Sequence, residues 1–160
     1  MNAVLHDKLS NTLKICDLHY QRMIFAWEQV NPHFPVNVNK LESFSPFELA
    51  LIDQLIYRFS KLQDIMGSRL FRQVLEVLGE DVSGIPFIDI LNKLEKLGLI
   101  DNAETWINLR QTRNSISHEY PFAMEEQAEG LNLLIKDIGR LSDIWFSFKD
   151  YALARIPKSE

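Results

Sequence analysis

Residues 43–59, SFSPFELALIDQLIYRF, decide the fold class, because they combine a helix start with the apolar spacing of a long helix. Ser45 suits an N-cap, Pro46 suits the first turn, and Glu48 follows three residues after Ser45, as in a capping box. Apolar residues then recur at intervals of three and four, which predicts one buried face and a kink near Gly67. The predicted stripe is Ile52, Leu55, Ile56, Phe59, Leu62, Met66, Leu70, Val74 and Leu78.

The same spacing predicts helices over 5–27, 86–98, 101–117 and 120–156. The final helix has a clear apolar stripe of its own. Four long amphipathic helices and one short helix indicate an all-α fold, an antiparallel up-and-down four-helix bundle with an additional short helix. We expect one domain over 1–160, with a frayed tail at 157–160. The stripe of the final helix is Leu131, Leu134, Ile138, Leu141, Trp145 and Phe148.

The connection between the first two long helices is expected to be an irregular loop. Residues 31–39, NPHFPVNVN, contain two prolines and three asparagines. The segment FPVNVN is the one candidate for a strand, and its prolines and asparagines weaken that interpretation. His33 is expected at the surface of this loop.

Composition restricts the function classes. The net charge of −5 over 160 residues gives no support for a general nucleic-acid coat, so any phosphate binding must come from a local patch. Cys16 is the sole cysteine, which excludes an internal disulfide and fits a reducing compartment. Neither a signal peptide nor a membrane span is indicated, and a cytoplasmic location is expected.

The stretch LRQTRNSISHEYP, residues 109–121, is unusual for a packed helix. On a wheel of about 100° per residue, Arg113 falls at the edge of the sector that faces the core. Arg110, Asn114 and His118 form an adjacent polar stripe at spacings of four. A guanidinium at a core margin must be paired or reach water, because an unpaired buried charge is costly.

Each of these residues also has a purely structural interpretation. Arg113 could pair with an acid on a neighbouring helix, such as Asp64 or Glu76. His118 could be favoured at the helix C-terminus by the helix dipole. Tyr120 could be an ordinary residue at the edge of the core, and Asn114 could be solvated.

The chemical interpretation starts from the types of the two ionisable side chains. A histidine titrates near neutrality and can give or take a proton, and an arginine holds a phosphate with a planar fork of donors. Together they supply what RNA cleavage needs when a 2′-hydroxyl attacks its own phosphodiester. That reaction needs no metal and no cofactor, and the sequence offers no metal-binding or Gly-rich phosphate motif.

These residues resemble a known family pattern. RNSISHEY, residues 113–120, resembles the R-polar-x-x-x-H motif of HEPN domains, in the R-x4-H-x-Y form of HepT-type toxins, and LIDQLIYRFSKLQDIMG resembles that family's second helix. The resemblance implies a helical homodimer whose two motifs face each other across the two-fold axis. It also implies a metal-independent endoribonuclease, the toxin of a type VII-like pair with an MntA-type nucleotidyltransferase antitoxin.

Carried onto this chain, the resemblance implies a role for each motif residue. Arg113 holds the scissile phosphate, His118 acts as general base or acid, and Asn114 orients the phosphate or the histidine. Tyr120 lines the cleft and accepts AMP from the antitoxin, which blocks the RNase. Arg110, which the wheel places beside the strip, is expected to contact flanking RNA phosphates.

The resemblance also implies an acidic residue on the second helix that supports the motif, and Asp64 is the candidate. Three functions are compatible with these residues. The first is an RNase toxin neutralised by the antitoxin, and the second is a non-catalytic nucleotide-binding or docking partner of a nucleotidyltransferase. The third is a structural bundle in which Arg113 is only salt-bridged.

Overall fold

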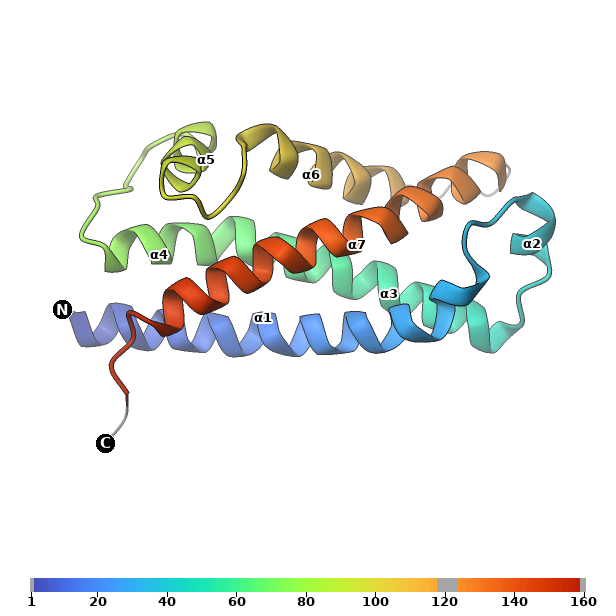
Figure 1. The fold of residues 1–160 in the computed structure, drawn as a ribbon, viewed down its shortest axis with the longest axis horizontal. Coiled ribbons are helices and arrows are strands. Elements are labelled where there is room, and N and C mark those ends of the chain that lie inside the picture. Colours follow the sequence, from blue (N-terminus) through green and yellow to red (C-terminus); the bar gives the residue numbers. More distant parts are fainter. Residues whose placement is uncertain (1, 118–123, 159–160) are drawn as a thin grey trace.

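The computed structural model describes residues 2–117 and 124–158, and the regular elements within these ranges are all helices, with no strand. The all-α prediction is confirmed. Helix α1 (Asn2–Val30) packs along α3 (Pro46–Ile65), which runs in the opposite direction (Figure 1). Within the described ranges, no helix is both long and apolar enough to cross a membrane.

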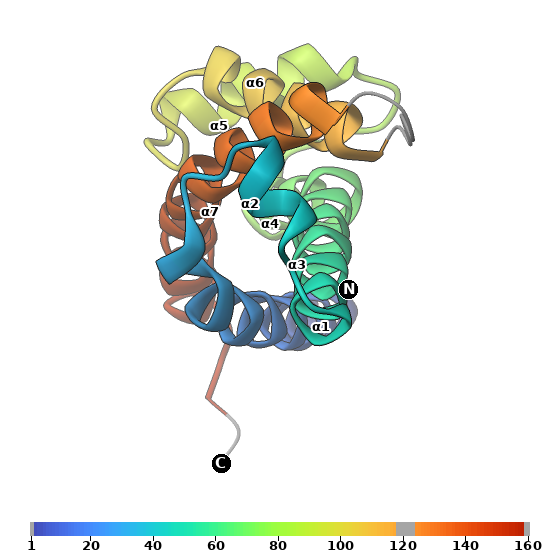
Figure 2. The same cartoon turned by 90° about the vertical axis from the view of Figure 1, so that its right-hand side faces the viewer.

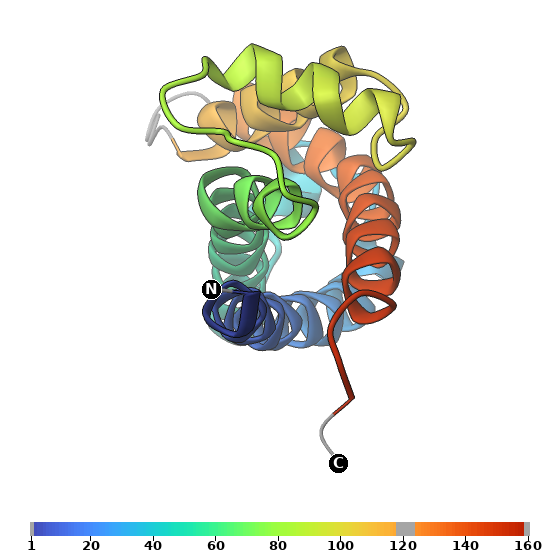
Figure 3. The ribbon, with the colours of Figure 1, turned by 90° about the vertical axis from the view of Figure 1, so that its left-hand side faces the viewer.

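The remaining long helices enclose the core, and two shorter helices cover one side of it. Helix α4 (Phe71–Val77) extends α3, and α7 (Met124–Leu153) crosses on the other side, so that α1, α3–α4 and α7 surround a common core (Figures 2 and 3). Helices α5 (Phe87–Lys96) and α6 (Ala103–Ser117) lie over one side of this arrangement. The core is continuous between the helices, and its largest fully buried side chains are Trp106, Trp145, Phe59, Phe71 and Phe148.

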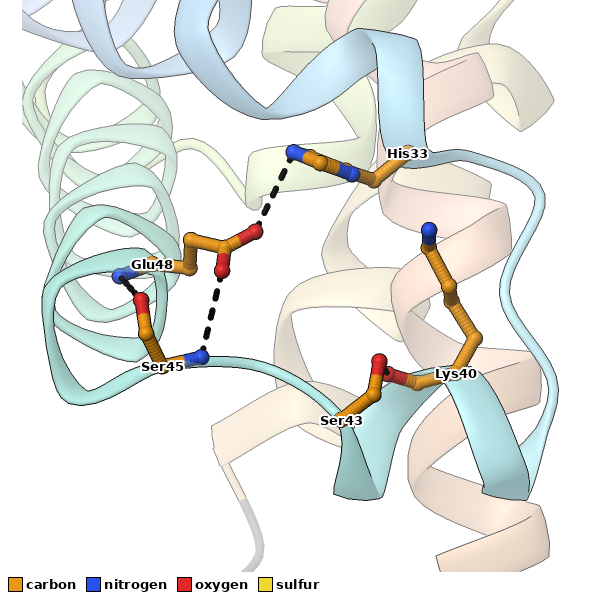
Figure 4. Close-up of polar contacts among 5 residues, drawn as sticks. All are labelled: His33, Lys40, Ser43, Ser45 and Glu48. Atoms are coloured by element: carbon orange, nitrogen blue, oxygen red, sulfur yellow. Dashed lines mark hydrogen bonds and ion pairs between the residues drawn. The ribbon is translucent and has the colours of Figure 1, made fainter.

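The predicted start of α3 is confirmed. The Glu48 amide donates to Ser45 Oγ at 3.2 Å, and the Ser45 amide donates to Glu48 Oε1 at 3.2 Å, which completes the capping box (Figure 4). The hydrogen bond from the Ser45 amide lowers the pKa of Glu48, because it favours the charged carboxylate. His33 Nε2 lies 3.1 Å from Glu48 Oε2, so the histidine expected at the surface is half-buried against the cap.

The connection before α3 is more ordered than the sequence indicates. A single 3₁₀ turn, η1 (Asn31–His33), is followed by the short helix α2 (Val38–Glu42), so the prediction of an irregular loop is wrong here. The Lys40 amide donates to Asn37 Oδ1 at 2.8 Å, which caps α2. Asn132 of α7 fixes the connection, because its side chain accepts from the Val36 amide and donates to the Val36 carbonyl, both at 2.8 Å.

A π-helical segment, η2 (Met66–Leu70), joins the end of α3 to the start of α4. It contains Gly67, the position of the predicted kink. This segment keeps Met66 and Leu70 fully buried. Leu78, expected in the core stripe, is instead 38% exposed. Helix α4 ends at Val77 and the chain turns away at Gly79, whose φ of 86° suits a glycine after a helix end.

Helix α6 begins at a side-chain cap and is tied to α7. The Thr105 amide donates to Asn102 Oδ1 at 2.8 Å, so Asn102 caps the helix. Farther along, the Thr112 hydroxyl donates to Asp137 of α7, and both residues are buried. This contact fixes the turn of α6 that also carries Arg113.

Candidate functional site

Arg113 joins α6 to α3 through an ion pair with Asp64. The arginine side chain is 24% exposed and the aspartate side chain is 46% exposed. The pairing partner is therefore one of the two acids that the sequence suggested. The ion pair links α6 to α3 and remains accessible to water, because both charged groups are partly exposed.

Asn114 lies beside this pair at the surface. Its Oδ1 accepts a hydrogen bond from Arg113 Nη2 at 3.1 Å, and its side chain is exposed. Asp64 and Asn114 thus contact two different nitrogens of the same guanidinium, Nη1 and Nη2. Two such contacts restrict the orientation of a planar fork of donors, which is the property that recognition of a phosphate requires.

Arg110 lies one turn before Arg113 on α6. Its guanidinium carbon sits 5.2 Å from the centroid of the Phe87 ring, at the start of α5. The side chain is exposed, so the arginine rests on an aromatic surface while its charge remains in water. Arg110 and Arg113 therefore place two positive charges on one stretch of a chain whose net charge is −5.

A cavity of about 520 Å³ opens beside these residues. We name it the Gln63 cavity. Helix α3 and the π-helical segment form one wall, and α5 and α6 form the opposite wall. Asp64, the partner of Arg113, belongs to its lining, so the cavity and the ion pair are continuous. The lining residues are Gln63, Asp64, Gly67, Ser68, Arg72, Phe87, Trp106 and Arg110.

The predicted site is therefore brought together in part. Arg110, Arg113, Asn114 and Asp64 all lie at the α3–α6 seam. His118 and Tyr120 lie outside the described residues. Over the residues that are described, no group of three or more His, Cys, Asp and Glu side chains could hold a metal ion.

Sequence reasoning missed the polar interior of the cavity. Gln63 follows Leu62 in an apolar stripe and gives no periodic signal of its own. It is nevertheless 1% exposed, and neither polar atom of its amide has a hydrogen-bond partner within the described ranges. Trp106 is fully buried in the core, and its Nε1 also lacks a partner among the described residues.

Comparison of the chain with protein-family models, with curated proteins and with solved structures finds no match.

Proposed function

We propose that this protein is a HEPN-type endoribonuclease of the HepT class, the toxin of a type VII-like toxin–antitoxin pair. The observation that carries the proposal is the geometry of Arg113. Its guanidinium lies at the partly exposed α3–α6 seam, is oriented by Asp64 and Asn114, and precedes His118 by five residues in the R-x4-H-x-Y pattern.

A purely structural role for the ion pair is the weaker explanation. Solvent-accessible ion pairs contribute on the order of 0–1 kcal/mol to stability, because water already solvates both charges. A pair whose members are 24% and 46% exposed therefore gives little reason to place an arginine at a core margin. Binding of a phosphate anion at the α3–α6 seam would explain why an arginine occupies this position.

The proposed reaction assigns one task to each group. The 2′-oxygen of the RNA forms a bond to phosphorus, and the bond from phosphorus to the 5′-oxygen breaks. Arg113 stabilises the charge that builds on the phosphate oxygens, with Asn114 as an orienting neighbour. His118 takes the proton from the 2′-hydroxyl or gives a proton to the departing 5′-oxygen, and water makes the other of these two transfers. The chemistry requires no metal.

The proposal includes the assembly expected of this class. The fold is an up-and-down four-helix bundle of α1, α3–α4, α6 and α7, with α5 as the additional short helix. Two copies form a cytoplasmic homodimer, so that the basic pair Arg110 and Arg113 occurs twice on a protein whose net charge is negative. An MntA-type nucleotidyltransferase transfers AMP to Tyr120 and neutralises the RNase.

The test is an RNA cleavage assay in the presence of a chelator. We expect the wild type to cut, and Arg113→Ala and His118→Ala each to lose at least a hundredfold in rate while they stay folded. Arg22→Ala, an exposed arginine on α1, and His6→Ala are matched controls that should cut like wild type. If the two motif variants retain wild-type activity, the catalytic assignment is wrong.

A second assay separates the toxin from a mere docking partner. After incubation with the nucleotidyltransferase and ATP, mass spectrometry should find one added AMP on Tyr120, and RNA cleavage should stop. Tyr120→Phe should acquire no AMP, and incubation with the nucleotidyltransferase and ATP should not change its own rate of RNA cleavage. Modification of Tyr120 in a protein that never cleaves RNA would support the non-catalytic alternative instead.

A further inference from the structure

Polar groups without partners lie in the wall of the Gln63 cavity. The amide of Gln63 and the indole nitrogen of Trp106 are buried, and none of their polar atoms has a hydrogen-bond partner among the residues described. Buried polar groups are almost always paired, and exceptions often mark a place where something else binds. Two unpaired residues in the wall of one cavity therefore point to a ligand that offers both a donor and an acceptor.

The cavity also has surfaces for a flat ring. Phe87 is stacked on Phe71, with ring centroids 6.5 Å apart and planes 9° apart, which holds its orientation. The guanidinium of Arg110 lies over the Phe87 ring. Aromatic rings and guanidinium planes are the two kinds of surface on which proteins stack unpaired bases.

The backbone leaves room at the cavity wall. Gly67 lies in the π-helical segment, a type of distortion that is frequent at functional sites. A methyl group added to Gly67 would lie 3.4 Å from Cζ2 and 3.7 Å from Nε1 of Trp106, and 3.8 Å from Cζ of Phe87. Glycine thus keeps open the space beside the unpaired indole nitrogen.

We propose that the Gln63 cavity binds a nucleobase: the base takes the place of the Arg110 guanidinium on the Phe87 ring, and its edge is hydrogen-bonded to Gln63 and Trp106. Every base carries neighbouring donors and acceptors on its edge, which is what a primary amide complements. Arg110 and Ser68, which also line the cavity, are exposed, so their side chains can change rotamer when a base enters.

The position of the cavity indicates where the base comes from. Asp64 lines the cavity and holds Arg113, so a nucleotide whose phosphate lies on Arg113 has its neighbouring base within reach of the cavity. Arg72 and Arg110 add two positive charges to the lining against the one negative charge of Asp64. The base is therefore one next to the cleaved phosphate of the RNA, an assignment that rests on the proposed function.

The experiment uses the three tryptophan indole signals in an NMR spectrum of the full chain, assigned with Trp106→Phe. AMP, GMP, CMP and UMP are titrated separately, with ribose 5-phosphate as the control that lacks a base. We expect at least one nucleotide to shift the Trp106 signal and to leave those of Trp27 and Trp145 in place. Ribose 5-phosphate should bind at least tenfold more weakly.

Two cavity variants and a matched control locate the binding site. Gly67→Ala, which adds a methyl to the wall, and Gln63→Met, which removes the amide, should each weaken nucleotide binding at least tenfold. Gly139→Ala on α7, where an added methyl meets nothing within 4 Å, should bind like wild type. The absence of any nucleotide shift, or wild-type binding by both cavity variants, overturns the proposal and leaves a structural cavity only.

A second arm distinguishes RNA from a free nucleotide. A short RNA is titrated into His118→Ala, which keeps the RNA intact, with and without Gly67→Ala. Weaker RNA binding in the double variant supports the RNA assignment, whereas equal RNA binding together with weaker AMP binding overturns it in favour of a free nucleotide. Because binding is measured without cleavage, a failure of the proposed RNase activity is recorded separately by the chelator assay.

Discussion

Asp64 of α3 forms an ion pair with Arg113 of α6 and also lines the Gln63 cavity. A single carboxylate therefore contacts the arginine that we expect to hold phosphate and the cavity that we expect to hold a base. Asp64 is therefore a positioning residue. Its replacement should lower the rate of RNA cleavage with little effect on the free energy of unfolding.

We predict that Asp64→Ala lowers the rate of RNA cleavage about tenfold, because Arg113 loses the contact that orients it. The free energy of unfolding should change by less than about 1 kcal/mol, because the ion pair is accessible to solvent. Cleavage kinetics and urea unfolding measure the two effects. Asp53→Ala, an exposed aspartate on the same helix, is the control and should cut like wild type. A large loss of stability in Asp64→Ala would show instead that the pair is structural.

Gln63→Met should raise the free energy of unfolding by about 1 kcal/mol, because it replaces a buried amide without partners by an apolar side chain of similar length. Urea unfolding monitored by circular dichroism measures the change. Gln54→Met, on the half-exposed side of α3, should leave stability nearly unchanged. If Gln63→Met is destabilised by several kcal/mol, the amide is satisfied in solution and the argument for an unfilled polar site fails.

The contact between α6 and α7 should contribute measurably to stability. Thr112→Val removes the hydroxyl that donates to the buried Asp137, so we expect a loss of about 2 kcal/mol. Thr112→Ser retains the hydroxyl and should lose less than half as much. Equal losses in the two variants, measured by urea unfolding, would assign the effect to packing of the methyl group.

Stability should also depend on the protonation of His19 on α1. Burial lowers the pKa of His19 below 6.5, and the nearby Arg58, which donates to His19 Nδ1 at 2.9 Å, lowers it further. The unfolded chain therefore binds a proton more readily than the folded one, and the free energy of unfolding should fall as the pH drops below about 6.5. Urea unfolding at pH 7.5 and 5.5 should show a smaller difference for His19→Gln than for wild type. An identical difference in both proteins would contradict the assignment to His19.

The fold was predictable where the signal is local. The capping box at Ser45 and the apolar stripe of α7 depend on residues a few positions apart, and the structure confirms both. The order of the connection was not predictable, because the hydrogen bonds between Asn132 and Val36 join residues 96 positions apart. A hydrogen bond between residues so far apart in the chain leaves no periodic pattern in the sequence.

The sequence could predict which residues belong to the candidate site, but not which of them contact one another. Wheel geometry placed Arg113 at the core margin and left Asp64 and Glu76 as alternative partners, because both belong to the same long helical segment. The π-helical segment at Met66–Leu70 alters the helical phase between these two acids, and the sequence marks it only by Gly67. Gln63 was missed because burial of an isolated polar residue depends on the helices that pack against it.

The most direct measurement of the central claim is an analysis of products from one RNA oligonucleotide and from DNA of the same sequence, both incubated with a chelator. We predict that the wild type cuts only the RNA, leaving 2′,3′-cyclic phosphate and 5′-hydroxyl ends, and that Arg113→Ala leaves the RNA intact. Cleavage of the DNA, or undiminished cleavage of the RNA by Arg113→Ala, would contradict this prediction.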